Sequence, residues 1–400
     1  MNPLITPAQA DQLIVDSINA LPCESIHFQE ALGRTLRQSL RADREFPPFD
    51  RVTMDGIACQ SADLSLGPLT IQGLHAAGSP TPEKLKPAHC WQIMTGATMP
   101  PDCDSIIPVE ELTLTESHAS IASEFTVSPG KFIHRQGSDY LTGTELLTAG
   151  TLLNPSHLGL AATIGAIELK VTRLPRITIL TTGDELVPPH EIPLPHQLRQ
   201  SNGTVLRSAI LQNSPTIESL QVHHLPDDLE ATISRLKEAL SSSDLILLSG
   251  GISKGKKDFV RPALESLIGL PSFHGIAQRP GKPLAYWKPN DNHPPVFALP
   301  GNANSTHTTF LRYVRPALCL LSGSVFPTPI TLPLVSPETP HPKLTLFLPA
   351  ELHSDGRLSL CKPQNSGDLA STLSASGFVE IPPGNSPVQA ANYTATHHAS

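Results

Sequence analysis

LILLSGGISKGKKD, residues 245–258, contains the pattern that decides the fold of this chain. An apolar run ends at two glycines, and the basic loop that follows ends on Asp258. A strand, a glycine turn and a helix start, in this order, form a loop whose backbone N–H groups can hold phosphate. The stretch contains neither the GxxxxGK[ST] of a P-loop nor the GxGxxG of a dinucleotide site. We therefore expect an anion-binding loop of another kind.

Strand and helix patterns alternate along the chain on both sides of this stretch. Short apolar strands separated by helices indicate βαβ units, and they predict a doubly wound, mostly parallel sheet with helices on both faces. The predicted strands lie within 176–186, 216–225, 244–251, 272–279, 283–288 and 295–302, and the predicted helices within 201–213, 227–240 and 305–321, with one more from Phe259.

The rest of the chain predicts three further regions. TPAQADQLIVDSINAL (6–21) places Thr before Pro, the order typical of a capped helix start, and further helices are expected at about 28–32 and at 154–165. Residues 46–138 read as short strands between Gly and Pro turns. The fold class is therefore multidomain α/β, with a split N-terminal linker domain (1–45 plus 139–174), an inserted β-rich domain (46–138), an α/β sheet domain (175–326) and a small C-terminal β-domain (327–400).

Composition narrows the classes of function. The 400 residues carry a formal net charge of −8, which argues against a nucleic-acid-binding protein with its basic face. No signal peptide and no apolar span of membrane length stands out, so we expect a soluble, cytoplasmic protein. The six cysteines contain no CxxC pair, and we expect buried thiols rather than a disulfide or zinc framework.

Three predicted strands end in a similar way, at TTGDEL (181–186), LSGG (248–251) and ALPGN (298–302). Ligands of open parallel sheets bind beyond the carboxyl ends of the strands. Glycine lets a ligand approach the backbone, and carboxylates with phosphate oxygens are ligands for Mg²⁺. A single glycine pair is more often only a tight turn. The residues expected to meet at this edge are Asp184, Glu185, Gly250, Gly251, Ser253, Asp258, Gly301 and Asn302.

QRPGKP (278–283) adds two cations on a stiff turn, Arg279 and Lys282. Two cations at this spacing suit a tetrahedral or pyrophosphate anion. An exposed basic turn without a ligand is the equally good alternative from the sequence.

Taken together, these stretches resemble the MoeA-type molybdopterin molybdenumtransferase family, whose relatives include the corresponding domain of gephyrin. The resemblance extends over almost the whole chain, and its specificity comes from the joint order and spacing of the motifs. They are FPPFDRVTMDGIA (46–58), MTGATMPPDCDSIIPVEE (94–111), RQGSD (135–139), TTGDEL, QSN (200–202), LSGGISKGKKD (248–258), RPGKP (279–283) and LPGN (299–302).

The resemblance implies the last step of molybdenum cofactor assembly. Adenylylated molybdopterin would bind, its pyrophosphate linkage would be hydrolysed with Mg²⁺, and molybdate would be inserted with release of AMP. It also implies a homodimer, whose cleft lies between the sheet domain of one subunit and the β-rich insertion of the other. Transient contacts with the adenylyltransferase and with recipient molybdoenzymes are expected as well.

The resemblance also assigns roles to particular residues of this chain. We expect Asp258 to be the base beside the metal-bound water, with Glu185 as the next candidate. Each acid could instead only cap or brace its own turn, the default role of an Asp at a helix start. The implied catalytic set is Asp55, Thr95, Asp139, Glu185, Asp227 and Asp258, with Glu185, Asp258 and Asp55 as metal ligands, and Arg279, Lys282, Ser305 and Ser366 around molybdate.

The chain departs from the family pattern at several of these places. Arg51 stands where an amide is usual, and Gly275 and Arg279 stand where lysines are usual. Ala303 replaces a proline after PGN, and Pro349 occupies the place of an expected arginine. The absence of the arginine removes an expected contact with the oxyanion, so either Lys343 or Arg51 substitutes for its charge or molybdate binding is weaker in this chain.

Two other functions fit parts of the sequence. An adenylyltransferase that makes the nucleotide-linked pterin would share the sheet domain, but it would lack the split N-terminal domain and the insertion. A scaffold or regulatory binder that had lost the chemistry would explain the departures at Arg51, at Gly275 and in the C-terminal domain. Turnover would separate these alternatives from the transferase.

Overall fold

The computed structural model describes residues 4–122, 124–214, 216–226, 228–251, 259–326, 328–365 and 367–396. The chain forms two compact units, one of residues 1–38, 149–155 and 168–400 and the other of residues 39–148 and 156–167. The finer division into four domains stays a prediction.

The larger unit is built on a six-stranded sheet with the order β16-β13-β17-β21-β20-β18. Its first four strands run parallel, β20 pairs antiparallel with β21, and the edge strand β18 pairs antiparallel with β20. The predicted mostly parallel sheet is therefore confirmed. The strands are β13 (Arg176–Thr182), β16 (Ser219–Leu225), β17 (Leu245–Ser249), β18 (Phe273–His274), β20 (Ala285–Trp287) and β21 (Val296–Leu299).

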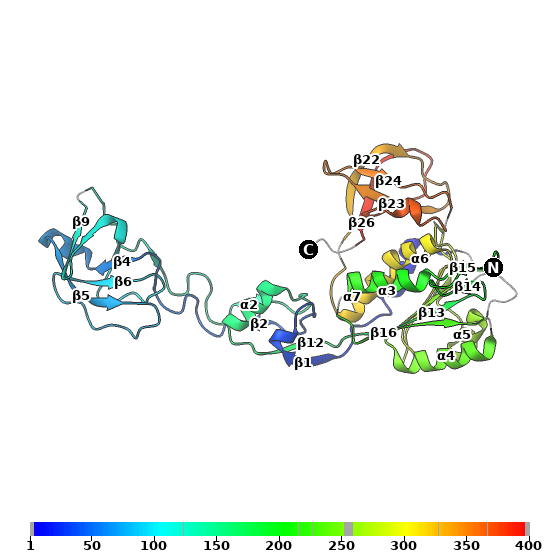
Figure 1. The fold of residues 1–400 in the computed structure, drawn as a ribbon, viewed down its shortest axis with the longest axis horizontal. Helices are drawn as coiled ribbons and strands as arrows, with labels where there is room; N and C mark the ends of the chain where they lie inside the picture. The colour runs from blue at the N-terminus through cyan, green and yellow to red at the C-terminus, as the bar shows by residue number, and fades with distance from the viewer. Residues whose placement is uncertain are drawn as a thin grey trace. The chain divides into compact units, whose positions relative to one another are not determined.

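Helices cover both faces of this sheet, as the alternation of strands and helices predicts (Figure 1). α3 (Asn202–Asn213), α6 (Ala303–Thr309) and α7 (Arg315–Ser322) lie on one face, and a π-helical turn (Phe310–Val314) joins the last two. α4 (Leu229–Ser242) and α5 (Val260–Ile268) lie on the other face. No helix in the described ranges is long and apolar enough to cross a membrane.

Strand β17 shows why the apolar run is continuous. Ile246 and Leu248 pack with α4 and α5, whereas Leu245 and Leu247 pack with α3 and α7. Successive side chains of a strand point to opposite faces, so a strand covered on both sides needs apolar residues at every position. All four side chains are fully buried. The sequence LILL therefore specifies a central strand.

The single strand predicted over 272–279 is wrong, because the structure divides it into two strands in different sheets. β18 belongs to the central sheet, and β19 (Gln278–Arg279) pairs in parallel with β23 of the C-terminal sheet. Gly275 between them has a φ of +96°, which residues with a side chain rarely adopt. A Cβ atom there would also lie 2.7 Å from Leu4 Cδ2. The chain therefore turns at Gly275, where a lysine would have a strained backbone.

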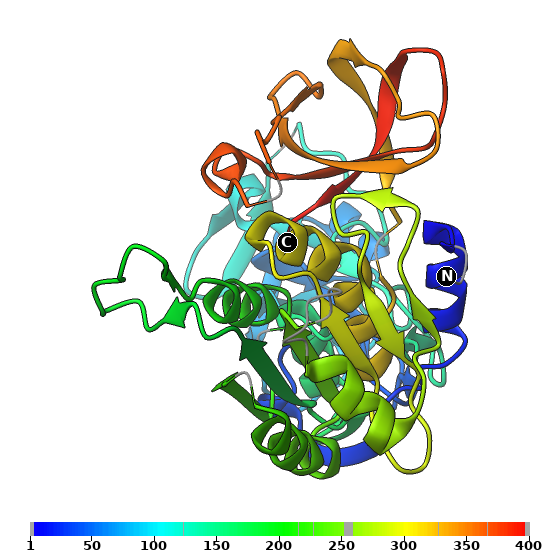
Figure 2. The same ribbon diagram turned by 90° about the vertical axis from the view of Figure 1, so that its right-hand side faces the viewer.

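The C-terminal strands form a sheet of their own, coloured orange to red in Figure 2. Its order is β19-β23-β24-β22-β26-β25, and pairing of β23 with β25 closes it into a barrel. Its core contains Leu358, Val379 and Ile381. The strands are β22 (Ile330–Glu338), β23 (Thr345–Leu352), β24 (Leu358–Leu360), β25 (Gly377–Ile381) and β26 (Val388–Ala395).

The N-terminal part of the same unit consists of α1 (Pro7–Val15) and a two-stranded ribbon. Thr6 caps α1 in a capping box with Gln9, as the Thr-Pro start predicts. β1 (Cys23–His27) and β12 (Glu168–Thr172) form the antiparallel ribbon. The helix expected at 28–32 is only a 3₁₀ turn, Phe28–Glu30, so that prediction is wrong. A further pair, β14 (Leu186–Val187) and β15 (Leu198–Arg199), follows β13.

The smaller unit is mainly β-structure and has one α-helix among its described residues, α2 (Pro155–Thr163). Its main sheet has the order β7-β4-β6-β5-β9-β8. Fully buried Ile57, Cys59, Cys90 and Ile107 fill its core. Its strands are β2 (Leu40–Arg41), β3 (Arg51–Val52), β4 (Gly56–Cys59), β5 (Leu69–His75), β6 (His89–Ile93), β7 (Ser105–Pro108), β8 (Leu112–Leu114), β9 (His118–Ile121), β10 (Ile133–His134) and β11 (Glu145–Leu147).

The cysteines are free thiols in both units. Cys59, Cys90 and Cys319 are buried, and burial raises the pKa of Cys59 to about 12. Cys23 is exposed, and Cys103 and Cys361 are only partly buried, so the prediction of buried thiols does not hold for these three.

Candidate active site

Three glycine turns meet at the carboxyl ends of β13, β17 and β21, which are neighbours in the sheet. Gly250 has a φ of +93°, and a Cβ atom on it would lie 2.9 Å from the Thr182 carbonyl oxygen. The position of a Cβ atom on Gly301 is 3.6 Å from the Cα atom of Gly250. Gly251 has a φ of +66° and packs against Val260 of α5. The structure therefore brings Gly250, Gly251 and Gly301 together, as the sequence predicts, and only glycine fits the first two positions.

Asn202, the first residue of α3, ties these turns together. Its Nδ2 atom donates hydrogen bonds to Ser249 Oγ at 2.8 Å and to the Gly301 carbonyl oxygen at 2.7 Å. Thr306 Oγ1 donates to the Pro300 carbonyl oxygen at 2.6 Å. Asn202 is buried, and a buried amide with two short bonds holds its neighbours in one geometry. Sequence reasoning quoted QSN (200–202) but assigned Asn202 no role, because a neutral amide carries no charge signal.

Glu185 follows β13 and folds back over Gly183. Its carboxylate oxygens lie 2.8 Å from the position that a Cβ atom on Gly183 would occupy. The side chain is exposed and makes no hydrogen bond with any residue that the structure describes. Asp184 beside it is exposed too. Both carboxylates thus stand at the glycine edge, and the oxygens of Glu185 are open to an incoming group.

The two cations of the RPGKP turn are exposed, whereas the backbone of the turn is held in place by buried residues. Gln278 is buried, accepts a hydrogen bond from the Tyr313 hydroxyl, and donates from Nε2 to the Pro280 carbonyl oxygen at 3.1 Å. A Cβ atom on Gly281 would lie 2.4 Å from Thr309 Cγ2 of α6, so the turn packs tightly on that helix. Arg279 and Lys282 are exposed. The turn is fixed, and its charges face solvent.

Ser305 lies on α6, the helix on which this turn packs, and is buried. Asn302 occupies the cap position of α6 and is exposed. Pro349 is part of β23 and pairs with Phe378, while Lys343 precedes that strand and is exposed. Pro349, which stands where the resemblance places an arginine, is therefore an uncharged strand residue.

Four predicted residues lie outside the described ranges, and the structure reports nothing on them. They are Asp227, Ser253, Asp258 and Ser366.

Asp55 and Thr95 form a pair in the smaller unit. The Asp55 Oδ1 atom accepts hydrogen bonds from the Thr95 backbone N–H at 2.7 Å and from its hydroxyl at 2.8 Å. These bonds, the backbone one first, lower the pKa of the exposed Asp55 carboxyl. Gly56 follows with a φ of +153°, and a Cβ atom on it would overlap the Ile107 carbonyl oxygen. The turn holds the carboxylate ionised and in one orientation.

Asp139 belongs to a second polar group in the same unit. Its Oδ1 atom lies 2.8 Å from His134 Nε2, and Nδ1 of the same ring lies 3.2 Å from an Arg51 guanidinium nitrogen. Arg can only donate, so Nδ1 accepts and Nε2 carries the proton that binds Asp139. Arg51, where an amide is usual, thus contacts His134 directly. Sequence reasoning missed His134, because a lone histidine before RQGSD gave no spacing signal.

The predicted metal trio extends over both units and includes Asp258, which lies outside the described ranges. Asp55 belongs to the smaller unit and Glu185 to the larger one. No group of three or more His, Cys, Asp or Glu side chains among the described residues has the arrangement of a metal site. The trio stays a prediction.

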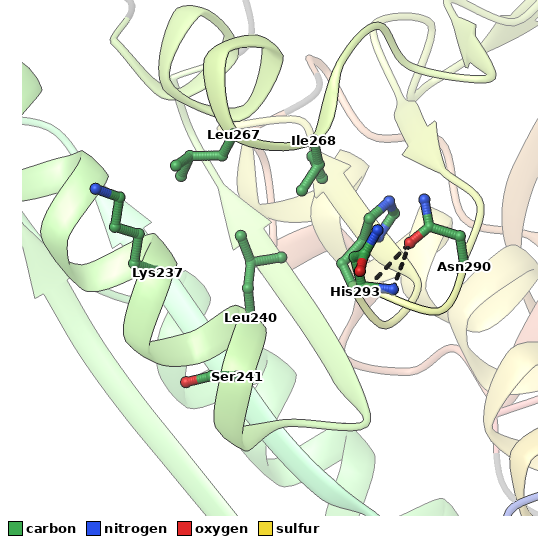
Figure 3. A pocket seen from close by; sticks show the side chains of 8 residues that line it. Lys237, Leu240, Ser241, Leu267, Ile268, Asn290 and His293 are labelled. Atoms are coloured by element: carbon green, nitrogen blue, oxygen red, sulfur yellow. Dashed lines mark hydrogen bonds between the residues drawn. The ribbon is translucent and has the colours of Figure 1, made fainter.

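A hollow of about 430 Å³ lies at the opposite end of the sheet, where α4, α5 and the turn before β21 meet (Figure 3). In it, the backbone N–H of His293 donates to Asn290 Oδ1 at 3.2 Å. None of the predicted site residues lines it. Its lining residues are Lys237, Leu240, Ser241, Leu267, Ile268, Asn290, Asn292 and His293.

Known proteins of one family resemble this chain in sequence and in fold. A model of the MoeA N-terminal region (domain I and II) matches residues 5–165, and one of a probable molybdopterin binding domain matches residues 178–319. A molybdopterin molybdenumtransferase from Synechocystis sp. is 33% identical over 365 residues, which cover 90% of each chain. Gephyrin from Dictyostelium discoideum is 32% identical over 77% of this chain and 48% of its own length. The crystal structure of a molybdopterin biosynthesis MoeA protein from Pyrococcus horikoshii matches 99% of this chain and 100% of its own, with a TM-score of 0.81 and 26% identity.

Proposed function

This chain belongs to the molybdopterin molybdenumtransferase family, and from this premise we propose that it inserts molybdate into adenylylated molybdopterin, with hydrolysis of the pyrophosphate linkage and release of AMP. The observation that carries the proposal is the common edge formed by the ends of β13, β17 and β21. Similarity to relatives over nine-tenths of the chain supports the same activity.

The glycine edge binds the phosphates of the pterin nucleotide in this proposal. Backbone N–H groups of a glycine turn attract an anion without the obstruction of a side chain. Asn202 fixes the relative positions of the turns after β17 and β21, through Ser249 and Gly301. Fixed donors stabilise developing charge more effectively than donors that must reorganise.

A divalent cation, proposed to be Mg²⁺, fits the chemistry of this edge. The exposed Glu185 carboxylate makes no hydrogen bond with a described residue, and Mg²⁺ takes one or two carboxylates together with phosphate oxygens. Glu185 would hold the ion, with Asp258 and Asp55 as the other expected ligands. A bound cation would neutralise charge on the pyrophosphate as it is cleaved.

Molybdate, a tetrahedral dianion, is the second substrate, and the RPGKP turn is its proposed site. Arg279 and Lys282 offer positive charge on a backbone that Gln278 and Thr309 hold in place. Ser305 lies on the helix against which the turn packs. Hydrogen bonds from charged Arg and Lys side chains to an oxyanion are stronger than hydrogen bonds between neutral groups. The role of Ser366 remains a proposal from the resemblance alone.

The acids of the smaller unit complete the proposal. Asp55, oriented by Thr95, and Asp139, bonded to His134, are expected to face the nucleotide from the insertion of a second subunit. Homodimer formation, Asp227 and Asp258 also stay proposals from the resemblance, as do contacts with the adenylyltransferase and molybdoenzymes. The cytoplasmic location is proposed on the same ground.

Product analysis tests the function and separates it from its rivals. The purified chain is incubated with adenylylated molybdopterin, Mg²⁺ and molybdate, and AMP is measured. We expect AMP release that requires both Mg²⁺ and molybdate. Adenylylation of molybdopterin from ATP without molybdate would identify an adenylyltransferase, which the relatives do not favour. Tight binding of the nucleotide without AMP release would identify a scaffold.

A further inference from the structure

A second cavity, of about 90 Å³, lies in the larger unit at the amino end of β13, away from the glycine edge. The end of α3, the body of α7 and the segment around Thr35 enclose it. A single water molecule needs about 10–15 Å³, so the cavity holds a few waters or one small polyatomic ion and excludes a nucleotide. Its polar lining includes Arg34, Thr35, Asn213 and Arg315.

Four polar atoms of this lining have no hydrogen-bond partner among the described residues. Arg34 Nε, Thr35 Oγ1, Arg315 Nε and Asn213 Oδ1 are buried and make no hydrogen bond with any described residue. Arg34, Thr35 and Arg315 are 7%, 2% and 3% exposed. Buried polar groups are almost always hydrogen-bonded in folded proteins. Three unused donors and one acceptor around one cavity therefore indicate a polar occupant.

The charges around the cavity do not balance. Arg34 is paired with Glu24, and Arg173 is paired with Asp244 and Glu218. Arg315 has no carboxylate partner among the described residues, and its Nη1 atom donates to the Ala395 carbonyl oxygen. A buried, unpaired guanidinium is strongly unfavourable.

The neighbours of Arg315 do not supply a negative charge. Burial raises the pKa of the nearby Cys319 thiol, so the sulfur is protonated near neutral pH. The carbonyl oxygen of Cys319, near the end of α7, already accepts from Ser324 N and from the Ser322 hydroxyl. Water could satisfy the neutral donors, but it would not neutralise the guanidinium.

We propose that this cavity is a binding site for one dihydrogenphosphate ion, a monoanion that matches the single unpaired guanidinium, held by Arg315, Arg34 and Thr35. Asn213 makes the site selective for a protonated oxyanion. Its Nδ2 atom donates to the Ala209 carbonyl oxygen at 2.9 Å, which leaves Oδ1 as an acceptor in the cavity. A P–OH of dihydrogenphosphate donates to that oxygen, whereas sulfate has no proton to give. The site is independent of the proposed pterin and molybdate chemistry.

Phosphate binding to the full chain tests this proposal. The protein is prepared without phosphate or sulfate, and titration calorimetry is run with phosphate, sulfate and chloride at equal ionic strength. We expect a saturable site that binds phosphate at least tenfold more tightly than it binds sulfate. Arg315→Gln and Asn213→Asp should each weaken it at least tenfold, whereas Arg279→Gln, which changes the RPGKP turn, should leave it unchanged.

Two further measurements keep the proposal testable if Arg315→Gln does not fold. Thr35→Val removes one donor at nearly constant shape and should weaken phosphate binding severalfold. Crystals soaked in arsenate, a scattering analogue of phosphate, should show an anomalous peak beside Arg315. Equal phosphate affinity in all variants, equal affinity for sulfate, or a cavity that contains only water would overturn the proposal.

Discussion

The side-chain amide of Asn202 donates a 2.7 Å hydrogen bond to the carbonyl oxygen of Gly301, and it thereby connects the start of α3 with the turn after β21. The same nitrogen binds Ser249 at the end of β17. Two loops far apart in sequence therefore keep one relative position, which is the condition for a site assembled from backbone N–H groups of separate turns.

Replacement of Asn202 should damage both stability and activity. Asn202→Ala leaves the buried Ser249 hydroxyl and the Gly301 carbonyl without this donor, and unmet buried groups cost about 1–3 kcal/mol each. We expect a fall of about this size in the free energy of unfolding, measured in urea, and a loss of AMP release. Asn292→Ala, at an exposed position, is the control and should change neither. An Asn202→Ala protein with native stability would contradict the role of this amide.

Gly250 should not tolerate a side chain. Gly250→Ala combines a strained φ with a Cβ atom 2.9 Å from the Thr182 carbonyl oxygen. Gly269→Ala is the matched control, because its φ is +80° and nothing lies within 4 Å of its Cβ position. Each strained residue costs on the order of 1–3 kcal/mol. We expect a larger loss of stability at Gly250 and, only there, weaker binding of the pterin nucleotide, both measurable by thermal unfolding with and without nucleotide. Equal losses of stability in Gly250→Ala and Gly269→Ala would contradict the crowding around Gly250.

The Tyr313 hydroxyl should influence molybdate use without contacting molybdate. Tyr313→Phe removes the donor to Gln278, and that amide holds the RPGKP turn through the Pro280 carbonyl oxygen. We expect the KM for molybdate to rise about tenfold, the size of effect expected from one hydrogen bond. The affinity for the pterin nucleotide should change little. Tyr393→Phe, which removes a bond to Ser376, is the control and should leave both values unchanged. An unchanged KM for molybdate in Tyr313→Phe would separate the turn from molybdate binding.

The Asp55 carboxyl should report the loss of its Thr95 partner. Thr95→Val removes the hydroxyl donor, so the lowered pKa of Asp55 should rise toward its ordinary value, which carboxyl NMR titration can follow. Because the pKa is lower in the folded state, its contribution to stability is present above the unfolded value and is lost as the pH falls through the lowered one. Thr95→Ser keeps the donor and should keep the low pKa. The same pKa in all three proteins would contradict the pairing.

The sheet was predictable because burial on both faces demands apolar residues throughout β17, and the glycines of the edge were predictable from their place after the strands. The division of 272–279 into two strands could not be predicted. The sequence shows one glycine, Gly275, in an alternating run, but it does not show that the φ of Gly275 is positive or that Leu4 packs against it. Asn202 and His134 were missed for a related reason. Their partners, Gly301 and Asp139, are recognised only when the fold brings them into contact.

Glu185 offers the most direct test of the central claim, which is that the edge formed by β13, β17 and β21 is where the pyrophosphate linkage is cleaved. AMP release from adenylylated molybdopterin, with Mg²⁺ and molybdate, is compared for Glu185→Gln and for Glu191→Gln, an exposed glutamate on the same connection. Loss of the carboxylate proposed to hold the divalent cation should slow the reaction about 100-fold or more in Glu185→Gln, with Glu191→Gln at the rate of the native chain. Equal rates for the two variants would contradict the account.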